Sequence, residues 1–212
     1  MASNALSTAY RPAELVLVAG PNGSGKTTIA DSYIRTRFPV WPKLNADALL
    51  RSLLDTPSLS LSGQPLLRAA QMIDTTALCL TLLGQPFVIE TVLSSEKYKS
   101  LIALARRANL IFRLVYITTE SPHINVERVR QRVLAGGHDV PKDRIISRWH
   151  RSMENLCWFA ARADRLVVAD NSGSELVVVA LRHLGGAVEI RLPTHPASQG
   201  LLSLQGQLPL VE

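Results

Sequence analysis

The sequence predicts an α/β fold in which a parallel β-sheet is covered by helices on both faces. Between residues 14 and 169, short apolar segments rich in Val, Leu and Ile alternate with longer segments whose apolar residues recur at helical spacing. This alternation is typical of parallel sheets, because a helix makes each crossover between two parallel strands. With 212 residues, 47% hydrophobic and 19% charged, the chain is expected to form one globular domain.

The first predicted strand is followed by a glycine-rich loop and a helix. Glu14–Ala19 is short and apolar, which is typical of a strand buried on both faces. A helix is expected over Lys26–Arg37. After two prolines, residues 43–45 form a weaker strand, and residues 48–54 form a brief helix that Asp47 could cap through its side chain.

The middle of the chain adds a long helix, a strand and a shorter helix. The long helix begins at Pro65, a residue favoured in the first helical turn, and ends at Gly84. Residues 87–90 are the next buried strand. Ser94 or Ser95 is expected to cap the helix that follows. The apolar face of this helix is formed by Tyr98, Leu101, Ile102 and Ala105.

Two helices are expected between the last two strands of the alternating series, residues 110–118 and 166–169. The first helix ends at Gly136-Gly137, and Pro141 opens the second, longer one. Their apolar faces are formed by Val126, Val129 and Val133 in the first and by Ile145, Trp149, Leu156 and Phe159 in the second.

The pattern changes after the last of these strands. Residues 176–192 form two apolar segments joined around Gly185-Gly186, which predicts a C-terminal β-hairpin attached to the sheet. Residues 193–212 are rich in Pro, Gln, Ser and Leu and are expected to form a loose tail. The sequence thus predicts a single domain over residues 1–192.

The composition favours a cytoplasmic protein that binds small anions. No apolar run approaches the ~20 residues of a membrane helix, and residues 1–11 lack the pattern of a secretory signal. Cys79 and Cys157 sit inside apolar sequence patterns, which predicts buried free thiols rather than a disulfide. The net charge is +6, and ten of the 23 Lys and Arg residues lie between Arg106 and Arg151. Aromatic stacking residues are not interleaved among them, so nucleic acid is an improbable partner.

The loop after the first strand matches the phosphate-binding loop (P-loop) pattern. Its glycines let successive backbone N–H groups face phosphates, Lys26 reaches the β- and γ-phosphates, and the Thr27 hydroxyl completes a Mg²⁺ shell. The following helix directs its N-terminus at the same anion. ATP and Mg²⁺ are therefore the expected cofactors of a P-loop phosphotransferase. The loop and the residue after it read Gly20-Pro21-Asn22-Gly23-Ser24-Gly25-Lys26-Thr27-Thr28.

Two carboxylates are candidates for the base that accepts the proton of an acceptor hydroxyl. Asp47 follows the second predicted strand and Glu90 ends the third, at the sheet edge where ligands bind in open α/β folds. The alternatives are that Asp47 only caps its helix and that Glu90 is only a surface residue at a strand end. The residues themselves leave this choice open.

Arginines line two helices that flank Gly136-Gly137. The spacing places one stripe on each helix, opposite the apolar face, and predicts a helical lid over about residues 122–150 that closes on a triphosphate. One arginine from each helix is expected to be catalytic, with Arg132 and Arg148 favoured. A solvated helix face is the alternative for the others. The stripes consist of Arg128 and Arg132 on the first helix and Arg144, Arg148 and Arg151, with Asn155, on the second.

Several of these motifs, in this order, resemble the zeta-toxin family and are most similar to its short, chromosomally encoded branch. The resemblance covers about residues 14–173. The segments that carry it are residues 20–28, Asn45-Ala46-Asp47 with Arg51, Glu90-Thr91 with Ser94, the run from Arg128 and Arg132 to Gly136-Gly137-His138 and Val140-Pro141, and Asp170-Asn171-Ser172.

The resemblance implies a P-loop kinase fold and transfer of the ATP γ-phosphate to a sugar hydroxyl, typically the 3′-hydroxyl of UDP-N-acetylglucosamine. It implies that Asp47 is the base, that Glu90 and Thr91 face the acceptor sugar, and that lid arginines stabilise the γ-phosphate. Asn45 and Arg51 also fall in the segments that would bind the substrate. An antitoxin protein is an implied partner.

Two other hypotheses stay open beside a UDP-sugar kinase. The first is a P-loop kinase for another acceptor, such as a nucleotide, an antibiotic or the 5′-hydroxyl of a nucleic acid. The second is a non-enzymatic ATP-binding module that binds a partner through its leucine-bearing C-terminal segment. The loop motif alone is compatible with all three.

Overall fold

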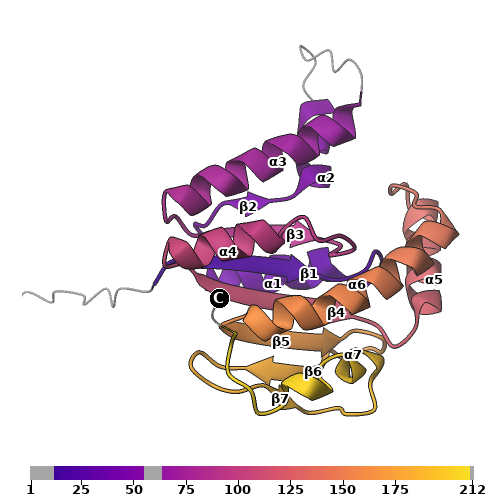
Figure 1. The fold of residues 1–212 in the computed structure, drawn as a ribbon. Helices are drawn as coiled ribbons and strands as arrows, with labels where there is room; N and C mark the ends of the chain where they lie inside the picture. The colour runs from indigo at the N-terminus through magenta and orange to yellow at the C-terminus, as the bar shows by residue number, and fades with distance from the viewer. Residues whose placement is uncertain (1–11, 55–63, 211–212) are drawn as a thin grey trace, which may run out of the picture.

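A seven-stranded sheet forms the centre of the molecule in the computed structural model, which describes residues 12–54 and 64–210 (Figure 1). The strand order is β2-β3-β1-β4-β5-β6-β7. The first five strands in this order are parallel to one another, β6 is antiparallel to β5, and β7 is antiparallel to β6. This confirms the predicted sheet and its C-terminal hairpin. The strands are β1 (Glu14–Ala19), β2 (Lys43–Leu44), β3 (Phe87–Thr91), β4 (Ile111–Thr118), β5 (Arg165–Asp170), β6 (Val177–Arg182) and β7 (Glu189–Ile190).

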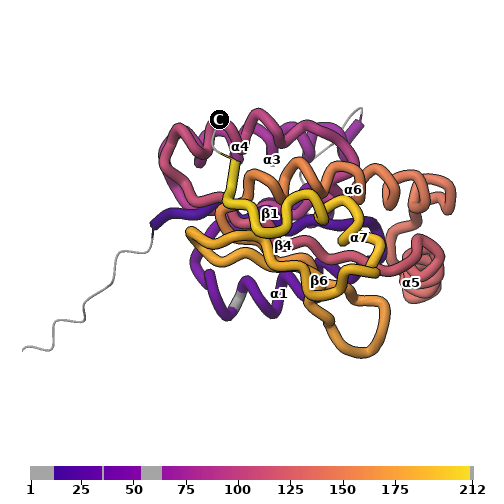
Figure 2. The backbone as a smooth tube through the Cα atoms, turned by 60° about the horizontal axis from the view of Figure 1, so that its bottom comes forward, coloured from indigo at the N-terminus to yellow at the C-terminus, as the bar shows by residue number. Residues whose placement is uncertain are grey.

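Helices cover both faces of the sheet. The larger part of the core lies between the sheet and α3, α4, α6 and α7, and a smaller part lies between the sheet and α1 (Figures 1 and 2). α5 packs against α6 beyond the carboxyl ends of the strands. The helices are α1 (Lys26–Arg37), α2 (Ala46–Leu54), α3 (Pro65–Leu82), α4 (Lys99–Arg107), α5 (Pro122–Leu134), α6 (Lys142–Arg162) and α7 (Pro196–Gln199).

The position of β1 explains its sequence and places the P-loop. β1 lies between β3 and β4, and all six of its residues are buried, so apolar side chains are needed on both of its faces. The loop that follows β1 therefore emerges at the middle of the sheet edge. The end of β3 and the start of α2 lie on the same edge, because parallel strands all end there.

Two helix starts differ from the prediction. α2 begins at Ala46, and its cap is Asn45, whose side-chain oxygen accepts a hydrogen bond from the Ala48 N–H at 3.0 Å. Asp47 is therefore not the cap. α4 begins at Lys99 after Tyr98, so neither Ser94 nor Ser95 caps it. The segment before Lys99 instead follows the sheet edge, where its backbone makes tertiary hydrogen bonds to α6.

The C-terminal segment is packed rather than loose, which corrects the sequence prediction for residues 193–210. α7 is followed by a short 3₁₀ turn, Leu202–Leu204, and both Leu201 and Leu204 are buried against the sheet. His195 caps α7 by accepting the Ala197 N–H at Nδ1. The hairpin extends the sheet beyond α6, and these leucines cover the apolar face that would otherwise be exposed.

A buried arginine joins this segment to the rest of the domain. Arg182, at the end of β6, is only 2% exposed and forms no ion pair with a described residue. Its guanidinium donates hydrogen bonds to the carbonyls of Ala160 and Ala163, at the C-terminus of α6, and to that of Gln207 in the tail. The negative end of the α6 dipole compensates this charge.

None of the helices within residues 12–54 and 64–210 is long and apolar enough to cross a bilayer.

Candidate active site

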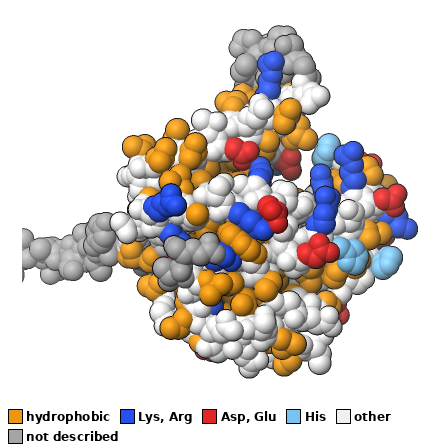
Figure 3. Space-filling model, in the orientation of Figure 1, with side chains coloured by type: hydrophobic (Ala, Val, Ile, Leu, Met, Phe, Trp, Pro, Cys, Tyr) orange, Lys and Arg blue, Asp and Glu red, His pale blue; other side chains and the backbone are white. Residues whose placement is uncertain are grey.

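A cleft of about 600 Å³ opens at the carboxyl edge of the sheet. Its walls are the P-loop, the start of α2, one face of α3, the end of β3 with the loop after it, and the arginines of α5 and α6. Lys and Arg side chains gather where α5 and α6 face α2 (Figure 3). The fold thus brings segments that are more than a hundred residues apart in the sequence to one cavity.

The P-loop needs its glycines for conformation and for space. Gly23 and Gly25 have φ angles of +80° and +86°, in the left-handed region that side chains disfavour. A Cβ atom at Gly23 would lie 2.6 Å from the Asn125 carbonyl oxygen, and one at Gly25 would lie 2.4 Å from the Asn171 amide nitrogen. The loop is therefore clamped from two sides, and only glycine fits.

The start of α1 suits a phosphate group. Gly25 precedes this helix without a side-chain cap, and the first turn holds no acidic residue, so its N–H groups and the positive end of its dipole are free for an anion. One further donor of the cleft lining, Arg128 Nη1, is buried without a partner in the described part of the chain. This donor fits the predicted ATP phosphates.

Lys26 lies almost buried at the base of the cleft. Its ammonium donates a hydrogen bond to the Pro21 carbonyl at 2.8 Å. Burial, with the nearby Arg132 charge, lowers the pKa of Lys26 to about 8, although the carboxylates of Glu90 and Asp47 act in the opposite direction. A phosphate beside Lys26 would favour its charged form, so this lysine is set to bind an anion.

Glu90 contacts the P-loop directly. Its carboxylate accepts hydrogen bonds from the Thr27 hydroxyl and from the Asn45 side-chain amide, each at 2.7 Å. Thr27 and Glu90 are the kind of oxygen ligands that Mg²⁺ takes together with substrate phosphates and water. Thr27 and Glu90 therefore fit the predicted metal, whereas the family resemblance implies that Glu90 faces the acceptor sugar. Thr91 follows Glu90 in the cleft wall.

Asp47 lies across the cleft from the P-loop, in the first turn of α2. Its side chain lines the cavity, is exposed, and accepts no hydrogen bond from a described residue. Because Asn45 supplies the helix cap, the capping alternative no longer accounts for Asp47. Lys26, Asp47 and Glu90 thus converge on one cleft, as the sequence predicted.

Three of the predicted lid arginines reach the cleft. Arg128 donates a hydrogen bond to the Ser172 carbonyl at 3.2 Å, and Arg148 donates one to the Asn22 side-chain oxygen at 3.3 Å. Partial burial and the charges of Arg144 and Arg151 lower the pKa of Arg148. Such crowding of positive charge favours an anion in the cleft.

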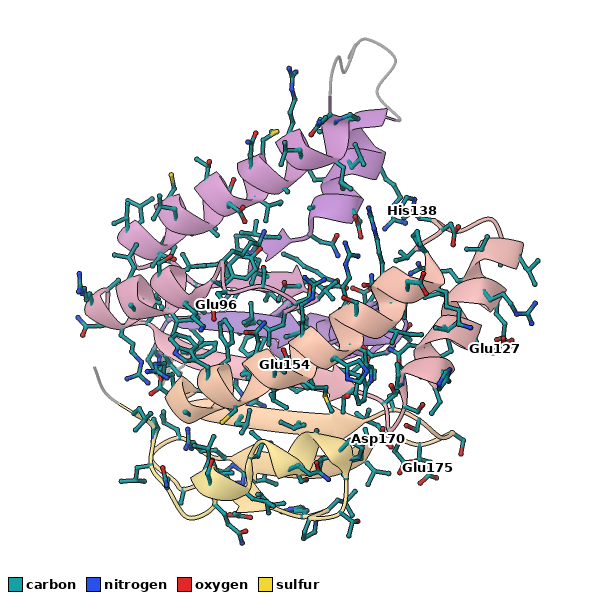
Figure 4. All side chains as sticks on the ribbon, turned by 45° about the vertical axis from the view of Figure 1, so that its right-hand side comes forward. Glu96, Glu127, His138, Glu154, Asp170 and Glu175 are labelled. Carbon is teal, nitrogen blue, oxygen red and sulfur yellow. The ribbon has the colours of Figure 1, made fainter. Side chains whose placement is uncertain are left out.

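The position of the third arginine, Arg132, accounts for a glycine in the Gly-Gly-His segment between α5 and α6. Arg132 donates a hydrogen bond to the His138 carbonyl at 2.8 Å, in the turn that Figure 4 labels. A Cβ atom at Gly137 would lie 2.6 Å from Arg132 Cγ, so a side chain there would displace the arginine. Gly137 therefore allows Arg132 to fold back toward the cleft.

Arg51 and Arg144 are not among the residues that line the cavity, and neither are Gly20, Pro21 and Ser24 of the P-loop. Arg144 is exposed on α6, away from the cleft wall. Arg51 is exposed as well, and its Nε donates a long hydrogen bond of 3.4 Å to the backbone carbonyl of Asp47. In this arrangement Arg51 contacts the segment that carries Asp47 rather than the cavity.

Two asparagines that sequence reasoning missed hold the P-loop. Asn125, fully buried in α5, donates a hydrogen bond to the Asn22 carbonyl at 2.6 Å. Asn171, directly after β5, donates one to the Ser24 carbonyl at 2.8 Å. The signal for Asn171 was its place after a buried strand. Asn125 gave no signal, because a single amide on a helix does not reveal a partner 103 positions away.

Comparison with known proteins places the chain in a family. Residues 15–156 match the sequence profile described as AAA domain. A comparison with curated protein sequences found no match.

Solved structures share the fold at low sequence identity. A chain of the AvrRxo1-ORF1:AvrRxo1-ORF2 complex, solved with sulphate ions, is 17% identical with a TM-score of 0.68, and the match covers 94% of this chain and 66% of that one. A chain of the PezAT chromosomal toxin-antitoxin system of Streptococcus pneumoniae is 17% identical with a TM-score of 0.55 and coverage of 76% and 68%.

A putative kinase from Chloroflexus aurantiacus J-10-fl is 23% identical, with a TM-score of 0.50 and coverage of 67% of this chain and 80% of that one. At these identities the likeness concerns the fold alone, whereas the profile match extends over more than half of the chain. The chain therefore belongs to the AAA domain family, and its fold is the α/β P-loop kinase fold.

Proposed function

We propose that the protein is an ATP-dependent kinase that transfers the γ-phosphoryl group to a hydroxyl of a small acceptor. The observation that carries this proposal is the composition of the cleft at the carboxyl edge of the sheet. A P-loop lysine, two carboxylates from separate elements and three arginines from a helix pair surround one cavity. Phosphoryl transfer needs these parts together, because catalysis depends on positioning and on neutralising charge around the transferred group.

The nucleotide half of the cleft has defined roles in this proposal. The P-loop N–H groups, Lys26 and the start of α1 bind the phosphates, and Thr27 with Glu90 holds Mg²⁺. The metal, when bound, neutralises charge on the phosphate oxygens. Arg132 and Arg148 approach from the lid and stabilise charge on the transferring group, while Arg128, tied to Ser172, binds the nucleotide from the side.

Asp47 is the proposed general base. Both Glu90 oxygens are already engaged by Thr27 and Asn45, whereas the exposed Asp47 carboxylate lines the cleft and accepts no hydrogen bond from the described residues. A free carboxylate can accept the proton of the acceptor hydroxyl as the phosphoryl group transfers. The fixed carboxylate is better suited to hold a metal than to exchange a proton.

A nucleotide sugar such as UDP-N-acetylglucosamine is the proposed acceptor. The wall of the cleft formed by α3 and the segment before α4 combines the aromatic ring of Tyr98 and the apolar side chains of Ala70 and Ile73 with Lys97, whose ammonium is paired with Asp74 at 3.0 Å. Such a wall suits a planar base next to a diphosphate. The resemblance to zeta toxins favours the same acceptor. By analogy with the toxin-antitoxin complex among its structural relatives, we also propose an antitoxin protein as a partner.

The experiment that tests the function is acceptor-dependent consumption of ATP. Purified protein is incubated with ATP, Mg²⁺ and UDP-N-acetylglucosamine, and the products are analysed by mass spectrometry and ³¹P NMR. Gain of one phosphoryl group by the nucleotide sugar is the expected result. Parallel reactions contain a mononucleotide, an aminoglycoside or a 5′-hydroxyl oligonucleotide. Phosphorylation of one of these alone would support the proposed kinase activity and replace the proposed acceptor. If neither the nucleotide sugar nor any of these compounds is phosphorylated, the proposed kinase activity is contradicted.

A further inference from the structure

The loop after β3 adopts a conformation that its sequence does not favour. Residues 91–95, the last residue of β3 and the loop after it, are here called the acceptor loop and line the cleft. Leu93 in this loop has a φ angle of +59° and is only 1% exposed. A leucine rarely adopts this left-handed conformation, and such conformations persist only where surrounding contacts impose them.

Two side chains of α6 impose it. Ser152 Oγ donates a hydrogen bond to the Val92 carbonyl at 2.7 Å, and Asn155 Nδ2 donates one to the Leu93 carbonyl at 3.0 Å. Within the loop, the Leu93 N–H is bound by Thr91 Oγ1 at 3.2 Å. Two consecutive carbonyls are thus fixed from a helix about sixty positions away in the sequence.

A buried tyrosine lies beside the Ser152 contact. Ser152 is fully buried, and its hydroxyl has a single proton, which it gives to the Val92 carbonyl. The Tyr116 hydroxyl, 2.9 Å away, can then donate to Ser152 Oγ, and it also reaches Met153 Sδ at 3.4 Å. Burial raises the pKa of Tyr116, so this hydroxyl keeps its proton and stays available as a donor.

The same face of α6 carries a lid arginine. Arg148, Ser152 and Asn155 are spaced four and three residues apart, so they lie on one side of the helix. Arg148 contacts Asn22 of the P-loop, and the other two contact the acceptor loop. One rigid helix therefore touches both halves of the cleft.

We propose that Ser152 and Asn155 are positioning residues that hold the acceptor loop in the shape that binds the acceptor. The inference rests on the proposed kinase function and extends it to residues outside the cleft. Neither side chain needs to contact ATP or the transferred group. Their loss should weaken binding of the acceptor and leave ATP binding intact.

The test compares Asn155→Leu and Ser152→Ala with Glu154→Gln, a control on the same helix whose side chain is exposed (Figure 4). Steady-state kinetics with ATP and UDP-N-acetylglucosamine give the KM of each substrate. We expect the acceptor KM of both test variants to rise about tenfold, as for loss of one well-made hydrogen bond, with ATP KM within about twofold. Thermal melting of each variant shows that it is folded.

Hydrogen–deuterium exchange of residues 91–95 supplies a readout that needs no turnover. Faster exchange in Asn155→Leu and Ser152→Ala, but not in Glu154→Gln, shows that α6 holds the loop. Active variants with an unchanged acceptor KM would overturn the inference and leave the kinase in place. A wild-type protein that phosphorylates no acceptor would instead overturn the proposed function, and with it the role of the loop.

Discussion

The two walls of the cleft are built by different means. The P-loop wall is made of backbone: glycines with positive φ angles, free N–H groups at a helix start, and carbonyls that Asn125 and Asn171 fix in place. The facing wall is made of side chains, the arginines of α5 and α6 and the carboxylate of Asp47. Several of these are exposed, and they come from elements far apart in the chain.

This contrast indicates a division of labour. A backbone cradle binds phosphates in one geometry whatever the acceptor, whereas side chains on separate elements can differ between related enzymes without disturbing the fold. We therefore expect changes in the P-loop wall to remove nucleotide binding. Changes in the facing wall should affect rate or acceptor affinity with ATP still bound.

Replacing the P-loop lysine should have the largest effect. Lys26→Met removes the only ammonium at the base of the cleft in the described part of the chain, so turnover should fall by more than about 10³-fold, a loss comparable to removing a charge-stabilising group from a phosphoryl-transfer site. The measurement is acceptor-dependent ATP consumption at saturating ATP. Turnover at the wild-type rate would contradict the P-loop assignment.

Removing the proposed base should reduce rate without reducing affinity. Asp47→Asn keeps the shape of the side chain and loses the proton acceptor, so kcat should fall about 10²–10⁴-fold while both KM values change little. Glu175→Gln, which removes an exposed carboxylate outside the cleft, is the control. A fall in kcat of less than about threefold would exclude Asp47 as the base.

Variants of the lid arginines test whether side chains of the facing wall stabilise the transition state. Arg132→Ala and Arg148→Ala should each lower kcat about 10²-fold, as loss of one charge-stabilising donor does, with a smaller change in ATP affinity. Arg144→Ala is the matched control, because Arg144 lies on the same lid outside the cavity. Equal effects of all three variants would indicate a general effect of charge on the lid.

A Glu90 variant distinguishes a role of this carboxylate in metal binding from a role in acceptor binding. If its carboxylate holds Mg²⁺ beside Thr27, Glu90→Gln should raise the Mg²⁺ concentration needed for half-maximal rate about tenfold. If it binds the acceptor, as the family resemblance implies, the same variant should raise the acceptor KM at saturating Mg²⁺. Titrating metal and acceptor in turn distinguishes the two roles.

The pH dependence of ATP binding should be the smallest effect. The pKa of Lys26 is lowered to about 8 in the free protein, and only the charged ammonium attracts phosphate. ATP affinity should therefore be nearly constant below pH 8 and fall by up to tenfold per pH unit above it. Calorimetry should also detect proton uptake near pH 8. In Lys26→Arg the guanidinium stays charged, so a persistent fall above pH 8 would assign the titration to another group.

How far the sequence predicted the molecule depends on how local each signal is. β1, the P-loop and α1 have the predicted boundaries because a strand, a glycine loop and a helix start follow each other in one motif. The start of α2 was predicted two residues late. Asn45 and Asp47 are both good capping residues, and only the contact of Asn45 with Glu90 favours the first.

The contacts that Asn125 and Asn171 make with the P-loop carbonyls could not be predicted. Asn125 and Asn171 act on partners 103 and 147 positions away, and the sequence has no periodicity that records such pairs. The packed C-terminal segment was missed for a related reason. Its leucines have partners only after the antiparallel hairpin has extended the sheet.

Arg182 has a consequence for how the domain comes apart. Its charge is stabilised by carbonyls of α6 and of the tail at the same time, and its Nε has no partner among the described residues. Release of either segment would remove carbonyls that accept hydrogen bonds from this cation, at a cost in free energy. The hairpin, the end of α6 and the tail should therefore unfold as one cooperative unit, and a chain shortened after Leu192 should lose stability across the whole domain.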